Sequence, residues 1–262
     1  MMRQKLSNLS YPFIAILIAA AVWQVFVWLT RLPDYFLPLP TTVALEVINN
    51  AWLLLVHGWV TTYESVLGFL ISVIIGFPIA LIIVWSKPIE KSITPLLVFT
   101  QTFPKIAIAP LFIIWFGFGI FPKIVISFLV AFFPVVISSI TGLKAVEPDL
   151  DDLVRSMGAS DLQKFVKIRI PNSLPYFFSG AKVSVALAVV GAVVGEFVAA
   201  QEGLGYLILV ANNHVDTKLM FAGFVGLMVI GALLYFVVDY LERICISWHA
   251  SMREQNVTLI TS

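Results

Sequence analysis

The sequence contains few charged residues for its length. Of its 262 residues, 12% are Asp, Glu, Lys or Arg, about half the share that soluble domains carry. Hydrophobic residues make up 60% of the chain, and the mean hydropathy is +0.99. The net charge is only +1, so the composition offers no basic surface for nucleic acid. This balance predicts an all-α, polytopic membrane protein in direct contact with the lipid bilayer.

Residues that bind metals or nucleotides are also scarce. Cys245 is the single cysteine, which excludes an internal disulfide and a cysteine-based metal cluster. The histidines, His57, His214 and His249, are scattered without ligand spacing, so we expect no metal site. The phosphate-binding pattern G-x-x-x-x-G-K-[ST] is absent, as are Ser/His/Asp and HExxH groupings. We therefore expect no catalytic residue and no cofactor in this chain, and any ATP must be bound by another chain.

Six apolar runs are long enough to cross a membrane. They are 11–29, 61–85, 92–120, 124–143, 176–200 and 219–238. The first run follows two basic residues and also fits a signal peptide, but no clear cleavage site follows, so we interpret it as a retained helix. Pro95, Pro104 and Pro110 interrupt the third run. They predict a discontinuous helix, because irregular backbone at membrane depth is tolerated only against protein or a water-filled cavity.

The distribution of Lys and Arg predicts that both termini are cytoplasmic. With the N-terminus inside, eleven of these residues fall in inner segments and three in outer ones, with Lys105 and Lys182 unassigned. The three outer residues are Arg31, Lys123 and Lys218. This orientation places the segment between the fourth and fifth runs in the cytoplasm.

That segment, 144–175, is the most charged part of the chain and carries the signals of two short helices. A proline followed by aspartates suits a helix N-terminus, and Gly158 is a plausible terminator. Ser160 and the glutamine three residues later form a capping box for a second helix. Pro171 and Pro175 are expected to interrupt the helix before the chain returns to the membrane.

The spacing in this segment resembles the cytoplasmic loop of membrane permeases from bacterial ATP-binding-cassette (ABC) importers. That loop has the pattern E-A-A, three residues, Gly, nine residues, Ile, any residue, Leu, Pro. In this chain the corresponding positions hold Asp152, Leu153, Val154, Gly158, Ile168, Ile170 and Pro171. The following run, through VVGEF and GLGYLI, is similar to permeases for sulfonates, taurine, nitrate and vitamin precursors. The resemblance covers the core of the chain, 61–248.

The resemblance implies a single transmembrane permease domain over 1–262 with about six transmembrane helices and the type I (MetI-like) fold, in a bacterial inner membrane. A cytoplasmic ATPase dimer would bind ATP and Mg²⁺, and a periplasmic or lipid-anchored binding protein would deliver a small polar or anionic solute. The permease would act as a homodimer or as a dimer with a similar partner. The loop at 144–175 would couple the ATPase to the membrane helices.

The resemblance also implies roles for residues of this coupling loop. Leu153 and Met157 would fill a cleft in the ATPase, and Gly158 would permit a turn that a Cβ would obstruct. The charged residues expected to pair with the partner are Asp152, Arg155 and Asp161.

Ionisable residues within the spans are candidates for the translocation pathway, since a charge in lipid costs about 2.5–3.5 kcal/mol. Lys105, beside the expected helix break, could meet the solute, or it could snorkel or pair with an acid such as Glu196. Glu196 could meet the solute or anchor a neighbouring helix or the G-L-G turn by hydrogen bonds. Aromatic residues such as Trp115 could stack on a ring or pack against lipid. We expect Glu64 and Lys182 near the membrane interfaces.

An ion-coupled secondary transporter or channel is the alternative function. Several spans with intramembrane charges fit it, but such a carrier needs no paired-helix docking element facing the cytoplasm. The substrate stays open among nitrate, sulfonate, taurine, bicarbonate, a thiamine-precursor pyrimidine and riboflavin. The run PKIAIAPLFIIWFGFG resembles the vitamin-precursor branch slightly more.

Overall fold

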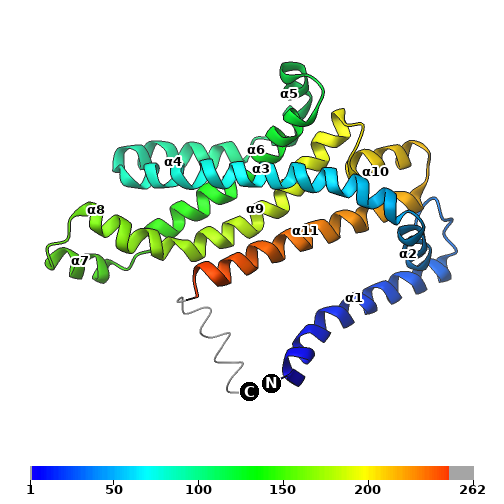
Figure 1. Ribbon diagram of the computed structural model, residues 1–262, viewed down its shortest axis with the longest axis horizontal. Coiled ribbons are helices and arrows are strands. Elements are labelled where there is room, and N and C mark those ends of the chain that lie inside the picture. Colours follow the sequence, from blue (N-terminus) through cyan, green and yellow to red (C-terminus); the bar gives the residue numbers. More distant parts are fainter. Residues whose placement is uncertain (1, 248–262) are drawn as a thin grey trace.

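Three long helices form the centre of the molecule. The computed structural model describes residues 2–247, in which α3 (Ala51–Trp85), α6 (Ile120–Lys144) and α9 (Ile170–Ala199) run along the long axis (Figure 1). The most extensive contacts are those of α6 with α9 and with α3. The described residues contain no strand, and the all-α prediction is confirmed. The other helices are α1 (Met2–Thr30), α2 (Pro40–Asn49), α4 (Lys87–Gln101), η1 (Lys105–Ile108), α5 (Ala109–Phe116), α7 (Pro148–Ser156), α8 (Asp161–Lys164), η2 (Phe165–Arg169), α10 (Leu204–Asn213) and α11 (Thr217–Cys245).

Small residues allow the three central helices to approach closely. A Cβ added to Gly68 of α3 or to Gly191 of α9 would collide with Ser127 of α6. The Ser127 hydroxyl donates a hydrogen bond to the Ala188 carbonyl (2.9 Å), and Ser72 donates to the Phe128 carbonyl (3.0 Å). In lipid, where apolar surface alone gives helices no reason to associate, such close packing and hydrogen bonding hold them together.

The remaining helices cover this centre unequally. α11 packs along α9, and α10 fills the space between α11 and the N-terminal part of α3 around the buried Leu204 and Leu207. α1 diverges from the bundle and contacts it near its C-terminal end, where Trp23 packs against Phe221 of α11 (Figure 1). The N-terminal part of α1 is therefore left beside the bundle rather than within it.

By length and composition, four helical segments of the described chain can cross a membrane. A fifth is formed if α4, η1 and α5 count as one span bent by 81°. The sixth predicted run, 11–29, lies within α1, but its apolar part, Ile14–Thr30, is shorter than the 18 residues this count requires. The sequence predicts a polar tail over 241–262; its first residues, 241–245, continue α11, and residues 248–262 lie outside the described part of the chain.

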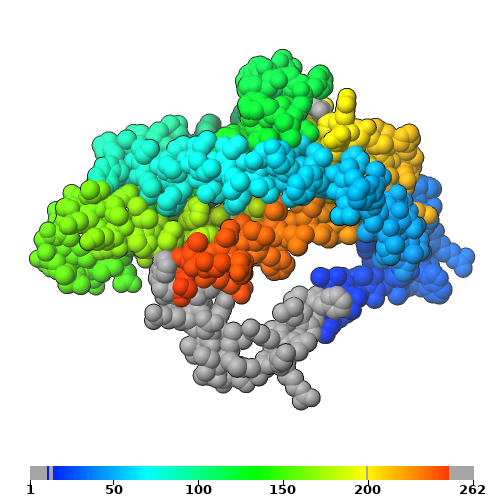
Figure 2. Space-filling model, in the orientation of Figure 1, coloured from blue at the N-terminus to red at the C-terminus, as the bar shows by residue number. Residues whose placement is uncertain are grey.

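The break predicted in the third run is confirmed. α4 ends at Gln101, Pro104 precedes the single turn η1, and Pro110 lies in the first turn of α5, where its missing N–H is tolerated. Pro95 and Pro134, by contrast, lie inside continuous helices. The space-filling view shows α5 and the turn after it projecting from the bundle (Figure 2).

The interruption predicted at Pro171 and Pro175 is wrong. The chain stays helical from Asp161 to Val198, so the second short helix is the cytoplasmic extension of a transmembrane helix. The reason is a turn of π-helix, η2, immediately before α9. Its wider i→i+5 hydrogen bonding accommodates Pro171, which cannot donate to the carbonyl four residues earlier.

Candidate functional site

The first candidate site is the pair of short helices in 144–175, and its local structure follows the sequence closely. Gly158 ends α7 with φ +77°, and its N–H donates to the Arg155 carbonyl (3.0 Å). Gln163 N–H donates to Ser160 Oγ (3.3 Å), while Ser160 N–H donates to Gln163 Oε1 (2.9 Å). The predicted terminator and capping box are both confirmed.

The coupling loop has an exposed tip and a buried base. Leu153 and Met157 are 56% and 77% exposed, and the side chains of Asp152, Arg155 and Asp161 are exposed as well. In the part of the chain that the structure describes, none of these three charges forms an ion pair. The tip therefore presents apolar side chains and free charges together. The partly buried motif residues are Val154, Ile168 and Pro171.

One set of contacts holds the loop together, and another fastens it to the bundle. Asp151 of α7 pairs with Lys164 of α8, and Arg169 lies 3.9 Å from the same carboxylate, so the two short helices are held together. Phe165 is buried among residues of α3 and α6, and its ring meets that of Trp85 edge to face at 5.0 Å. A movement of the loop would therefore act directly on the end of α3.

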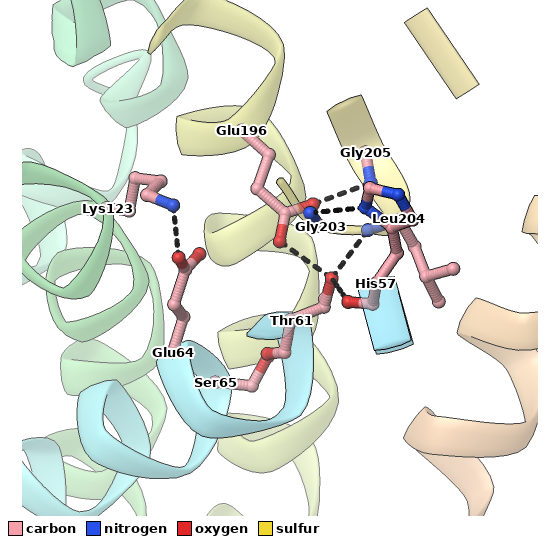
Figure 3. Close-up of polar contacts among 9 residues, drawn as sticks. All are labelled: His57, Thr61, Glu64, Ser65, Lys123, Glu196, Gly203, Leu204 and Gly205. Carbon is pink, nitrogen blue, oxygen red and sulfur yellow. Dashed lines mark hydrogen bonds and ion pairs between the residues drawn. The ribbon is translucent and has the colours of Figure 1, made fainter. Parts of the chain in front are cut away.

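The second candidate site is a buried polar cluster at the opposite end of α9. Glu196 accepts hydrogen bonds from the Thr61 hydroxyl (2.6 Å) and from Gly205 N–H (2.5 Å), as Figure 3 shows. Thr61 Oγ1 accepts from Leu204 N–H (2.8 Å), and His57 Nδ1 accepts from Gly203 N–H (3.0 Å). Side chains of α3 and α9 thus bind three successive N–H groups at the start of α10.

This cluster supplies hydrogen-bond acceptors for the first N–H groups of α10. The first N–H groups of a helix lack partners within it and carry partial positive charge, which a carboxylate offsets well. Glu196 and Thr61 are both fully buried. Of the two roles considered for Glu196, the hydrogen bonds match the anchor, which joins α3, α9 and the G-L-G turn.

The structure does not bring together the residues predicted for the translocation pathway. Lys105 is half-buried, with its Nζ 4.3 Å from the ring centroid of Phe133 on α6 rather than beside Glu196. Trp115 lies on the projecting α5 and is 62% exposed. Among the described residues, no ion pair, hydrogen bond or ring contact joins Lys105, Trp115 and Glu196.

Two charged residues expected near the membrane interfaces are paired inside the bundle. Glu64, expected near the end of its span, is fully buried in an ion pair with Lys123, which was counted as an outer residue (Figure 3). α3 begins at Ala51, so Glu64 lies well inside the helix. Lys182, expected to snorkel, pairs with Asp239 (2.5 Å) and Glu242 of α11. A charge inside one span and an opposite charge just beyond the end of another were the signal that could have suggested both pairings.

The fold defines a multi-pass helical membrane protein. A structure of the MetNI methionine ABC transporter, inward facing, matches with a TM-score of 0.64 at 21% identity, covering 74% of this chain and 96% of that chain. This likeness confirms the predicted type I permease fold.

The family described as "binding-protein-dependent transport system inner membrane component" matches residues 68–245, and the chain belongs to this family. A probable ABC transporter permease of Haemophilus influenzae is 38% identical, over 88% of this chain and 94% of that protein. The formylaminopyrimidine transport permease of Halalkalibacterium halodurans is 33% identical (90% and 95% covered). A putative aliphatic sulfonates permease of Bacillus subtilis is 34% identical (88% and 84%). The chain is thus a permease subunit of an ABC importer, a multi-pass component of the inner membrane.

Proposed function

We propose that the coupling loop at 144–175 docks into a cytoplasmic ATPase and passes its movement to the membrane helices. The observation that carries this proposal is the contrast between the exposed tip, with Leu153 and Met157, and the base, where Phe165 is buried against α3 and α6. Exposed apolar side chains among charges are typical of a surface that a partner covers. The continuous helix from Asp161 to Val198 supplies a rigid connection from this tip into the membrane.

The other partners are proposed from the family. The ATPase would act as a dimer that binds and hydrolyses ATP with Mg²⁺, and a periplasmic or lipid-anchored binding protein would deliver the solute. Two copies of the permease would enclose the pathway, with both termini cytoplasmic. The exposed Ile114, Trp115 and Phe118 on and after α5 leave an apolar surface for lipid or for a second copy. We assign Lys105 and Trp115 to the pathway and Glu196 to the packing of its wall.

The solute is proposed to be small and polar. Two of the relatives are named for a formylaminopyrimidine and for aliphatic sulfonates, so a vitamin precursor and an anion both fit the similarity in sequence. The permease itself would alternate between inward-open and outward-open states, with ATP and the loaded binding protein shifting the balance between them.

Co-purification with an ABC ATPase from the same organism tests the coupling role. Gly158→Val should abolish ATPase binding and stimulated hydrolysis in liposomes, because a β-branched residue is strongly disfavoured at φ +77°. Gly158→Asn is the matched control, since asparagine tolerates this conformation and should retain most of the binding. Equal binding by the Val variant, or solute movement by the chain alone along an ion gradient, would contradict the proposal.

A further inference from the structure

A large cavity lies at the end of the bundle away from α7 and α8. It has a volume of about 800 Å³ and is bounded by the outer part of α3, the turn between α5 and α6, and the C-terminal end of α9. Three of its lining residues, Trp59, Tyr63 and Phe118, are aromatic and substantially exposed. Its wall also includes the buried ion pair of Glu64 and Lys123. The cavity therefore combines flat apolar surfaces with this ion pair as a buried polar point and with the exposed Gln201 and Glu202.

The polar point is suited to donate hydrogen bonds. Lys123 is 6% exposed, and its ammonium group has three N–H donors, of which Glu64 occupies one side (Figure 3). The carboxylate of Glu64 is fully buried beside it, so the charge of the ammonium is already balanced. What remains toward the cavity is donor capacity without net positive charge. Ring nitrogens and carbonyl oxygens are the acceptors that such a group can bind.

The charges around the cavity disfavour an anion. Among the described lining residues, Lys123 is the one cation, whereas Glu64 and Glu202 are both carboxylates. A fixed anion such as a sulfonate would have to compete with Glu64 for the ammonium, and it would lose its hydration without a free positive charge in return. An uncharged ring avoids this cost and gains from stacking on the aromatic side chains.

We propose that this cavity is a transit subsite for an uncharged, planar nitrogen heterocycle that carries ring-nitrogen or carbonyl acceptors. The ring lies against Trp59 or Tyr63 and accepts a hydrogen bond from Lys123. This inference rests on the proposed function, that of a permease receiving a small solute, and it narrows the solute to the heterocyclic class rather than the sulfonate class.

Direct binding to the full-length permease in phosphatidylglycerol nanodiscs tests the subsite. Saturation-transfer difference NMR is recorded at neutral pH with two probes, 4-aminopyrimidine and ethanesulfonate. The expected result is binding of the pyrimidine and no saturable signal from the sulfonate. Trp59→Ala should weaken pyrimidine binding at least about fivefold, the lower end of the effect of removing a stacking ring.

Trp52→Ala is the matched control. Trp52 lies on the same helix, is similarly exposed, at 77% against 71% for Trp59, and is not among the residues that line the cavity. Its replacement should leave the pyrimidine affinity unchanged. Equal losses in the two variants, equal binding of the two probes, or no binding of either would overturn the proposal.

A third variant tests the electrostatic argument. Glu64→Gln leaves the ammonium of Lys123 without its counter-charge, so ethanesulfonate should now bind while the shape of the side chain is kept. If Glu64→Gln does not fold, the pyrimidine affinities of Trp59→Ala and Trp52→Ala decide whether the subsite exists. ATPase co-purification from the same preparations separates the two proposals. If the ATPase binds and the pyrimidine does not, the subsite is wrong and the coupling role stands; the reverse result rejects the coupling role alone.

Discussion

The two ends of the bundle hold their charges in opposite ways. At the coupling loop, Asp151, Lys164 and Arg169 form partly exposed pairs, and the neighbouring charges face outward. At the far end, Glu64 and Glu196 are fully buried. Glu64 pairs with Lys123 of α6, and Glu196 accepts a hydrogen bond from Thr61 of α3. Exposed pairs contribute little to stability and can be exchanged for contacts with a partner. A buried ion pair that loses one partner leaves a desolvated charge, which destabilises the protein.

This difference implies that the two ends of the bundle have different roles. The loop end can rearrange its charges when another protein binds, because water screens them before and after. The far end fixes how α3, α6, α9 and α10 fit together, since its buried charges and hydrogen bonds join these helices. Movement transmitted from the loop should therefore shift the helices as units rather than loosen their far ends.

The largest effect is expected from removing one partner of the buried pair. Lys123→Met leaves Glu64 as an unpaired buried charge, which should lower the free energy of unfolding by about 3–5 kcal/mol. Lys144→Met is the control on the same helix: Lys144 pairs with Glu90 at 2.5 Å, but their side chains are 49% and 22% exposed. Its loss should cost no more than about 1 kcal/mol. Thermal unfolding in detergent, followed by circular dichroism, measures both.

The double variant Lys123→Met with Glu64→Gln completes this test. Neutralising both groups removes the unpaired charge, so it should recover most of the stability lost in the single variant. If Lys123→Met and Lys144→Met unfold at the same temperature, a buried ion pair contributes no more to stability than an exposed one. The proposed difference between the two ends would then be wrong.

A smaller effect is expected at the G-L-G turn. Gly203 has φ +114°, and an added Cβ would collide with the Glu196 carboxylate. Gly203→Ala should therefore destabilise the protein by about 1–3 kcal/mol through backbone strain and the displaced acceptor. Gly231→Ala is the control, because nothing lies within 4 Å of its added Cβ and the residue sits inside α11. Equal unfolding temperatures for the two variants would argue against an anchoring role for Glu196.

Local signals made much of the fold predictable from the sequence. The helix end at Gly158, the capping box at Ser160 and the break before Lys105 depend on a few neighbouring residues, and all three are present in the structure. A proline, a glycine or a short hydroxyl side chain has the same local effect in any fold. The local structure of the coupling loop was therefore predictable from the sequence in some detail.

The far end was not predictable in the same way. The contact between Glu64 and Lys123 depends on how α3 and α6 cross, and nothing near either residue in the sequence encodes that crossing. The start of α3 was also not predictable from the sequence. Its first ten residues contain His57 and two tryptophans, which suit a membrane interface, so the predicted run began only at 61. Pro171 gave a local signal that the π-turn before it overrode. Tertiary packing decided the contact between Glu64 and Lys123, whereas a local change of helix type decided the case of Pro171.

The smallest expected effect on stability lies at the coupling loop. There the comparison predicts that a substitution hardly changes the stability of the protein but impairs its function. Ser160→Ala removes the side chain that caps α8, a change of about 1 kcal/mol in the local stability of the second short helix. Because this helix continues into α9, global unfolding should hardly change, whereas amide exchange at Gln163 should accelerate and ATPase affinity should fall a few-fold. Ser160→Asp, which preserves a capping oxygen, should restore both. A large drop in unfolding temperature for Ser160→Ala would mean that the loop end is as tightly built as the far end, and that the coupling loop cannot rearrange independently of the bundle.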